Sequence, residues 1–214
     1  MDPSVVIEYF RAIVKIIDDK CPDRAPEIKE FLKANVKKIV RAPASVHKDK
    51  HCCFPGGLMV HTTTVMDVAE QIRSQYFSHI DKGSVFFCAL FHYMGNIGDA
   101  TGDLLVEQED SWHSRNGFLY KYNDQLRVMP LAERSLWLIK DNNIPISLDE
   151  WSAISNFGSS SSVSSKNEYS RFGSMNASDL EVILQTAVRI AIQMEQHAGK
   201  KIAKEAEKKM RAAG

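Results

Sequence analysis

Two histidines lie in glycine-containing apolar stretches, and their side chains are well suited to binding a metal. His61 follows the run Phe-Pro-Gly-Gly-Leu-Met-Val, and His92 follows Ala-Leu-Phe and precedes Tyr93. A neutral imidazole is a common ligand of divalent metals. It is also common as a buried core group that hydrogen-bonds to the backbone. The sequence leaves both interpretations open for His61 and His92.

Helices must position these histidines, because apolar residues recur along the chain at helical spacing. His61 falls in the first turn of a helix predicted over 58–76. His92 and Tyr93 fall at the end of a helix predicted over 84–95, which is apolar almost all round and is therefore expected to be buried. The other predicted helices cover 4–19, 28–39, 131–140 and two segments that begin after Ser147 and Ser178. The sequence thus predicts an all-α fold.

Capping residues predict where several of these helices begin. Ser147 with Glu150, and Ser178 with Glu181, have the spacing of a capping box. In that motif the two side chains satisfy backbone donors that have no partner within the helix. Pro3 suits the first helical position, where a missing backbone donor costs nothing.

Four segments lack a buried helical pattern. Residues 42–61 form a long approach loop that ends in Pro-Gly-Gly and His61. Alternation over 118–122 predicts a short strand or a hairpin with a turn immediately after it. The serine-rich run 158–165 predicts a flexible loop, because it lacks the glycine spacing and the lysine of a phosphate-binding loop. The charged run 200–211 predicts a solvated helix or a frayed end.

Composition narrows the class of protein. The 214 residues are 44% hydrophobic and 25% charged, which is ordinary for a globular domain, and 27 basic residues balance 27 acidic ones. A balanced charge gives no support for bulk attraction to nucleic acid or to a membrane surface. No apolar run approaches the roughly 18 residues that span a bilayer. The four cysteines include no Cys-x-x-Cys pair, so we expect free thiols in a reducing, cytoplasmic compartment.

The two histidine stretches resemble the signature stretches of the HD-domain metal-dependent phosphohydrolases. The Ala-Pro-Ala-Ser segment at 42–45 and the Gly-Gly-Leu that precedes His61 are similar to the first stretch of that family. The segments 110–138 and 148–154 resemble a branch that is common in bacteriophages. The segment 184–191 resembles the closing helix of the family.

This resemblance covers roughly residues 40–196 and implies a domain organisation. An HD-domain-like helical bundle is expected over 41–197, and an N-terminal helical pair, 1–40, is expected to pack on it. Residues 198–214 form a charged C-terminal tail. The resemblance to the phage branch implies a phage-encoded protein, located in the cytoplasm of a host cell or in the virion.

Family members hold their metal with two histidines and two aspartates, and the metal activates water for phosphoester hydrolysis. His61 and His92 match the two histidines. Tyr93 stands at the position of one aspartate, Val188 at that of the other, and Asn96 replaces a usual lysine. A neutral phenol is a poor ligand for a hard divalent cation, and valine cannot bind a metal. We therefore expect a ligand pocket formed by these five residues, in which the two histidines are a vestigial metal pair.

Other side chains are candidates for replacing the lost carboxylates. Asp99 and His113 are the catalytic candidates if the protein is active, with Glu109 and Asp110 as further acids. Acids scattered in a loop are more often solvated, and a loop histidine more often anchors the loop. The His-Cys-Cys run at 51–53 has the composition of a soft-metal site, but no second ligand pair follows at useful spacing.

The scaffold signals thus survive while both carboxylate positions are lost, and Asn156 and Phe157 stand where members usually have histidine or aspartate. The sequence predicts a degenerate, non-catalytic HD-domain protein that acts as a ligand-binding, protein-interaction or structural module. Its partner would be a protein or a nucleotide-like ligand, and a homo-oligomer is left open. No cofactor is expected. One alternative is a phosphohydrolase that uses Mn, Ni, Zn or Mg with non-standard ligands, and another is a virion component or an inhibitor of a host protein.

Overall fold

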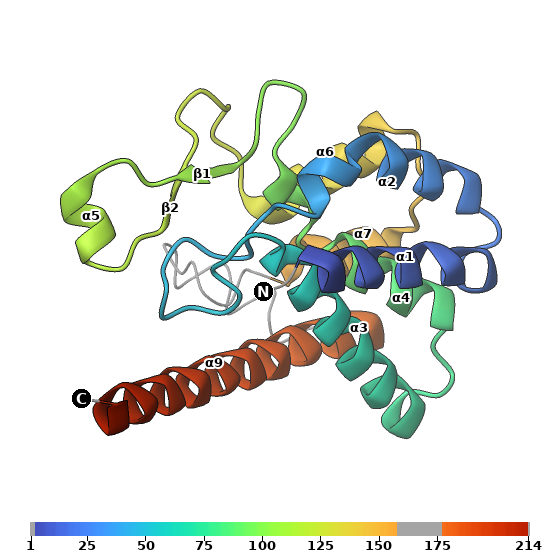
Figure 1. The fold of residues 1–214 in the computed structure, drawn as a ribbon. Helices are drawn as coiled ribbons and strands as arrows, with labels where there is room; N and C mark the ends of the chain where they lie inside the picture. The colour runs from blue at the N-terminus through green and yellow to red at the C-terminus, as the bar shows by residue number, and fades with distance from the viewer. Residues whose placement is uncertain (1–2, 158–176, 214) are drawn as a thin grey trace, which may run out of the picture.

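The computed structural model describes residues 3–157 and 177–213, and helices dominate this part of the chain (Figure 1). The all-α fold expected from the sequence is confirmed. In chain order the elements are α1 (Pro3–Lys20), α2 (Ala25–Ile39), α3 (Gly57–Tyr76), α4 (Lys82–Phe91), the short 3-10 helix η1 (Met94–Ile97), β1 (Leu105–Glu107), α5 (Ser111–Arg115), β2 (Tyr120–Tyr122), α6 (Leu131–Asp141), α7 (Leu148–Asn156) and α9 (Asp179–Ala213).

The core is built around α4, whose side chains from Val85 to Phe91 are all buried. This burial on every side follows from a helix that is apolar all round. Helices α3, α7 and α9 pack against α4, and α9 also packs against both α3 and α7. The amphipathic α1 covers α3 and α4, with Val6, Ile13 and Ile17 pointing inward. His61, near the start of α3, and His92, at the end of α4, are therefore held against this buried core.

A buried ion pair ties the N-terminal helices to this core. Arg24, at the start of α2, donates to Glu150 of α7 with 2.5 Å between Nη2 and Oε1. The same guanidinium lies 3.8 Å from the ring centroid of Phe87 in α4. Charged groups this deep in a protein are stable only when they are paired, so each partner depends on the other.

Helix α4 differs in its bounds from the predicted span of 84–95. It begins at Lys82, because the side chain of Asp81 caps it by accepting a hydrogen bond from the backbone nitrogen of Ser84. It ends at Phe91, so His92 is its C-cap, and the chain then tightens into η1. The imidazole of His92 consequently sits at a helix end.

Of the two predicted capping boxes, one is complete and the other is half formed. Ser147 and Glu150 make both hydrogen bonds of the motif at the start of α7. At the start of α9, Ser178 accepts from the backbone nitrogen of Glu181, but the carboxylate of Glu181 binds Ser152 and Asn156 on α7 instead. The Glu181 side chain, which the local sequence pattern predicts to cap α9, therefore makes a tertiary contact with α7.

The predicted strand forms, but its partner lies upstream. Strand β2 pairs antiparallel with β1, with Leu105 opposite Tyr122 and Glu107 opposite Tyr120. The chain returns from β1 to β2 through α5 and a turn at Gly117, whose φ of +92° suits glycine. The turn expected after residue 122 also forms, since the backbone nitrogen of Leu126 donates to the carbonyl oxygen of Asn123. The hairpin alternative was wrong, because alternation identifies a strand and not the strand that pairs with it.

Residues 105–122 form an arm that stands away from the helical body in Figure 1. A small apolar cluster of Leu104, Leu105 and Leu126 lies at its base. The approach loop holds the arm, since the carbonyl of Val46 accepts from the backbone nitrogen of Leu119. The arm is thus anchored to the loop that leads to His61.

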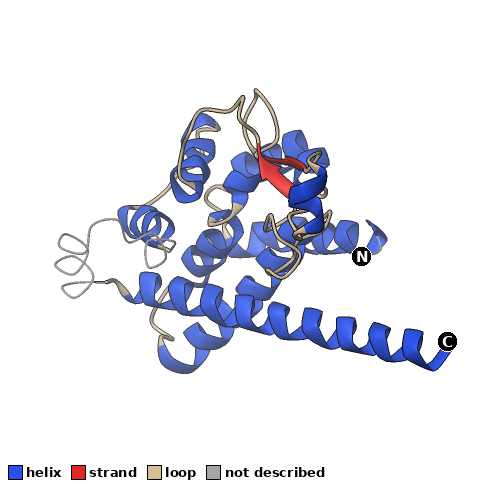
Figure 2. Cartoon of the chain, turned by 90° about the vertical axis from the view of Figure 1, so that its left-hand side faces the viewer, coloured by secondary structure: helices blue, strands red, loops and turns tan. Residues whose placement is uncertain are grey.

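Helix α9 runs without a break through Gly199 and ends at Ala213. Its first half packs on α3 and α7, and its C-terminal end extends past the helical body (Figures 1 and 2). Among the described residues no helix has the length and apolar character needed to cross a bilayer. The serine-rich run 158–165 lies outside the described residues.

Candidate functional site: a buried histidine and glutamate cluster

The approach loop closes tightly onto the start of α3. A Cβ atom on Gly57 would lie 1.9 Å from the carbonyl oxygen of Cys52, so only glycine permits this contact. Gly56 adopts a φ of +83°, in the region that glycine enters without strain. The Pro-Gly-Gly run therefore folds the chain back so that residues 51 and 52 lie against the first turn of α3.

Hydrogen bonds fix the loop in this position. The carbonyl oxygen of Cys52 accepts from the backbone nitrogens of Ala44 and Phe54, at 3.1 and 3.0 Å. The hydroxyl of Ser45 donates to the carbonyl oxygen of His51 at 2.7 Å. Because both ends of the loop are pinned, the imidazole of His51 is held over α3.

His61, in the first turns of α3, is fully buried and pairs with a carboxylate on α9. Its Nδ1 lies 2.9 Å from Oε2 and 3.2 Å from Oε1 of Glu195. An ionised carboxylate can only accept, so Nδ1 carries a hydrogen, and Nε2 carries a lone pair whenever the ring is neutral. This Nε2 is buried and has no hydrogen-bond partner among the described residues.

His92 is oriented in a similar way by the backbone. Its Nδ1 donates to the carbonyl oxygen of Ala89 at 2.8 Å, so its Nε2 also carries a lone pair when the ring is neutral. That Nε2 too is buried without a partner in the described part of the chain. The ring centroids of His92 and His61 are 5.5 Å apart. The two histidines predicted to share a pocket are therefore neighbours.

A third histidine joins them from the approach loop. The ring of His51 is buried, and its centroid lies 4.7 Å from that of His61. Its Nε2 is again buried with no partner among the residues described. One ligand atom from each of His51, His61 and Glu195 lies within 4.8 Å of the other two. These residues come from three separate segments: the approach loop, α3 and α9.

The charge states in this cluster follow from burial. Burial, and then the neighbouring His61, lowers the pKa of His51 to about 4. Burial followed by His61 also lowers the pKa of His92. For Glu195 burial acts to raise the pKa, but the hydrogen bond and charge of His61 outweigh it and lower the pKa overall. At neutral pH His51 and His92 are therefore neutral, and the carboxylate is ionised.

Aromatic rings occupy the space beside the histidines. The ring centroid of Tyr93 lies 4.6 Å from that of His61 and 5.0 Å from that of His92. Phe157 lies 5.2 Å from His92 and 5.5 Å from Tyr93, measured in the same way. Burial raises the pKa of Tyr93 to about 12, so the phenol stays neutral. Tyr93 thus packs against both histidines, whereas Phe157 packs against His92 and His51 packs against His61.

The other residues expected in the pocket serve the scaffold. Asn96 is buried, and its amide lies 3.4 Å from the carbonyl oxygens of Pro43 and Ala44, where it holds the approach loop. Val188 is buried in the main core. Asn156, which is not one of the five predicted pocket residues, donates to Glu181 of α9 at 2.9 Å.

The catalytic candidates Asp99 and His113 have partners of their own. The Asp99 carboxylate binds the guanidinium of Arg134 at 2.6 Å. His113 lies exposed on the arm, and its Nδ1 is 2.8 Å from Asp110, the residue that caps α5.

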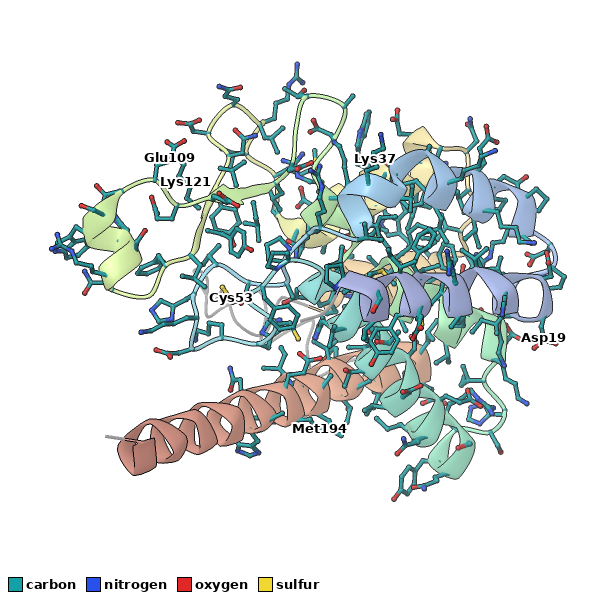
Figure 3. All side chains as sticks on the ribbon, in the orientation of Figure 1. Asp19, Lys37, Cys53, Glu109, Lys121 and Met194 are labelled. Carbon is teal, nitrogen blue, oxygen red and sulfur yellow. The ribbon has the colours of Figure 1, made fainter. Side chains whose placement is uncertain are left out.

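The acid Glu109, also on the arm, makes a 3.4 Å ion pair with Lys121 (Figure 3). The interactions that the structure gives Asp99, His113 and Glu109 are with residues outside the cluster of His51, His61 and Glu195.

Glu195 is the member of the cluster that sequence reasoning missed. It lies seven residues after Val188, which is two helical turns, or about 10 Å, along the same face of α9. The signal that could have found it is the buried stripe of Leu184, Val188 and Ala191, which continues to an acidic residue. In the sequence, His51 stands out only as part of the His-Cys-Cys run at 51–53, and this run does not indicate a contact with His61.

Comparison with known proteins gives no relative. No family model, no curated protein and no solved structure matches this chain.

Proposed function

We propose that this chain is a non-hydrolytic protein-interaction module built on an HD-like helical scaffold. The observation that carries the proposal is the pair of rings, Tyr93 and Phe157, packed on His61 and His92. Metal-dependent phosphoester hydrolysis needs a cation that is open to both water and substrate. Aromatic rings packed against the histidines provide no anionic ligands for such a cation.

The arm supports an interaction with a protein. Trp112 and Tyr122 are 61% and 67% exposed, and Phe118 and Leu119 are exposed beside them in sequence. Tryptophan and tyrosine are enriched among the residues that contribute most to protein interfaces. A short two-stranded arm that displays such side chains fits a protein surface better than a small ligand.

The absence of hydrolysis is tested by turnover measurements. Purified protein is assayed with a panel of nucleotides and phosphomonoesters in the presence of Mn, Ni, Zn or Mg. We expect no more turnover than with the His61→Ala variant. The proposal is overturned if the wild-type protein shows turnover that a chelator removes and that both His61→Ala and His92→Ala abolish.

The role of the arm is tested by differential capture. The double variant Trp112→Ala with Tyr122→Ala is compared with wild type and with a control, Tyr76→Ala with Trp137→Ala. The control removes aromatic side chains that are 74% and 53% exposed elsewhere on the surface. We expect one protein to be retained by wild type and control and lost from the arm variant. Equal retention by all three overturns the role of the arm.

A phosphohydrolase is the second candidate, and Glu195 is the observation that favours it. Two histidines and one glutamate are the protein ligands of several hydrolytic zinc sites. If the protein is a phosphohydrolase, turnover should be measurable in wild type and lost in Glu195→Gln and in His51→Ala. If the chain is a virion component, which is the remaining alternative from the sequence, it should co-purify with virus particles.

A further inference from the structure

We propose that His51, His61 and Glu195 form a site for one divalent transition metal ion of the zinc class. The donors are one ring nitrogen from each histidine and one carboxylate oxygen, which lie within 4.8 Å of one another. This site shares only His61 with the pattern that the HD resemblance implies. It stands apart from the proposed function, because a bound ion can be structural whether or not the chain hydrolyses anything.

The spacing of the donors fits a small ion. Ligand atoms held about 2.0–2.1 Å from a tetrahedral zinc ion are about 3.4 Å from one another. The Nδ1 of His61 lies 2.9 and 3.2 Å from the two oxygens of Glu195, so this nitrogen is the donor of His61, and the ion replaces the hydrogen that Glu195 accepts in the metal-free protein. The nitrogen of His51 is within 4.8 Å of both partners, and it must approach them for all three donors to reach one ion.

The unpartnered nitrogens point independently to a ligand. Buried polar atoms in native proteins almost always have a hydrogen-bond partner, and leaving one without a partner costs free energy. Here the Nε2 atoms of His51, His61 and His92 are all buried without a partner within the described part of the chain. An ion coordinated by His51 supplies the interaction that this ring lacks, and it compensates the buried negative charge of Glu195. The Nε2 atoms of His61 and His92 are not donors of the triad.

The chemistry of the donors selects the metal. Imidazole with carboxylate suits zinc, nickel and other first-row transition metals, whereas magnesium and calcium prefer oxygen ligands. The ion would join the approach loop, α3 and α9 at a single point.

Metal content and affinity test this site. Untagged protein is expressed with zinc, dialysed, and analysed for metal by mass spectrometry, and the metal-free protein is titrated with zinc against a chromophoric chelator. We expect one zinc per chain, and at least tenfold weaker binding for both His51→Gln and Glu195→Gln. His113→Gln, which changes an exposed histidine of the arm, is the matched control and should bind as wild type.

His92→Gln separates this site from the family pattern. The triad does not include His92, so the variant should retain one zinc per chain. Loss of zinc in His92→Gln with retention in His51→Gln and Glu195→Gln overturns the assignment. Failure of the wild-type protein to bind one zinc per chain also overturns the assignment. Circular dichroism shows whether each variant is folded. If zinc is bound and turnover is removed by a chelator, the zinc site stands and the non-hydrolytic proposal is overturned. If neither zinc nor turnover is found, the zinc site is overturned and the non-hydrolytic proposal stands.

Discussion

Nδ1 of His61 lies 2.9 Å from Oε2 of Glu195, a residue 134 positions later in the chain. This contact joins α3 to α9 through a fully buried ring and a side chain that is 8% exposed. Hydrogen bonds to charged groups contribute more than those between neutral groups. The pair therefore fixes the ring of His61 and places a negative charge beside the histidine cluster.

Removing this carboxylate should destabilise the metal-free protein. Glu195→Ala leaves Nδ1 of His61 buried without its acceptor, and we expect a loss of about 1.5–3 kcal/mol in the free energy of unfolding. Urea denaturation in the presence of a chelator measures the loss. Gln193→Ala, an exposed position on the same helix, is the control and should change little. Equal effects in the two variants would mean that the contact with His61 is not stabilising.

Much of the helical framework could be predicted because its signals are local. The apolar run of α4 and the capping box of Ser147 and Glu150 specify their elements without help from the rest of the chain. The partner of β2 and the side-chain contacts of Glu181 could not be predicted. Both are decided by segments that meet only after folding.

The buried ion pair of Arg24 and Glu150 should be costly to break. Arg24→Met leaves the carboxylate buried without its cation, and such changes cost about 3–5 kcal/mol. Thermal denaturation should show a large drop in Tm for this variant. Combining it with Glu150→Gln should recover part of the loss, because the uncompensated charge is gone. Glu109→Gln, in the exposed pair with Lys121, is the control and should leave Tm unchanged.

The same pair predicts a pH dependence. Burial acts to raise the pKa of Glu150, but hydrogen bonds from Arg24 and the backbone of Ser147, with the Arg24 charge, lower it overall. The stability contributed by Glu150 is therefore present above the unfolded pKa of a glutamate, about 4.3, and is lost as the pH falls through the lower folded value. Unfolding free energies measured from neutral to acidic pH should decline less steeply for Glu150→Gln than for wild type.

The two glycines at positions 57 and 199 should respond to alanine in opposite directions. In Gly57→Ala the new Cβ would meet the carbonyl oxygen of Cys52 at 1.9 Å, and overpacking of this kind costs about 1–3 kcal/mol. Gly199 has nothing within 4 Å of an added Cβ inside α9, so alanine there should stabilise by up to about 1 kcal/mol. Chemical denaturation of both variants distinguishes the signs. A neutral Gly57→Ala would show that the approach loop shifts freely.

The candidate site was only partly predictable for a geometric reason. His61 and His92 could be paired from their sequence stretches, and their rings do lie side by side. His51 lies ten residues before His61 in the sequence, and the two rings meet only because the Pro-Gly-Gly turn reverses the direction of the loop. The contact of Glu195 with His61 depends on the position of α9 along α3, and no local sequence pattern predicts that position.

Restoring the two lost carboxylates tests how far the geometry follows the HD pattern. In the double variant Tyr93→Asp with Val188→Asp, one new carboxylate would stand next to His92 and the other inside the core, where Val188 is 5% exposed. Unpaired buried charge is unfavourable, so we expect a lower Tm than wild type in metal-free buffer. Added zinc or manganese should raise that Tm by more than it raises the wild-type value, because binding to the native state stabilises it.

The matched control for this experiment is Tyr93→Asn with Val188→Asn, which has the same shape without the charge. It should show the lower Tm but not the larger metal response, because an amide oxygen is a weaker ligand than a carboxylate for these ions. Equal metal responses in the two double variants would mean that positions 93 and 188 do not face a common ion. The arrangement of His61 and His92 would then be a shared pocket without the metal geometry that the HD resemblance implies.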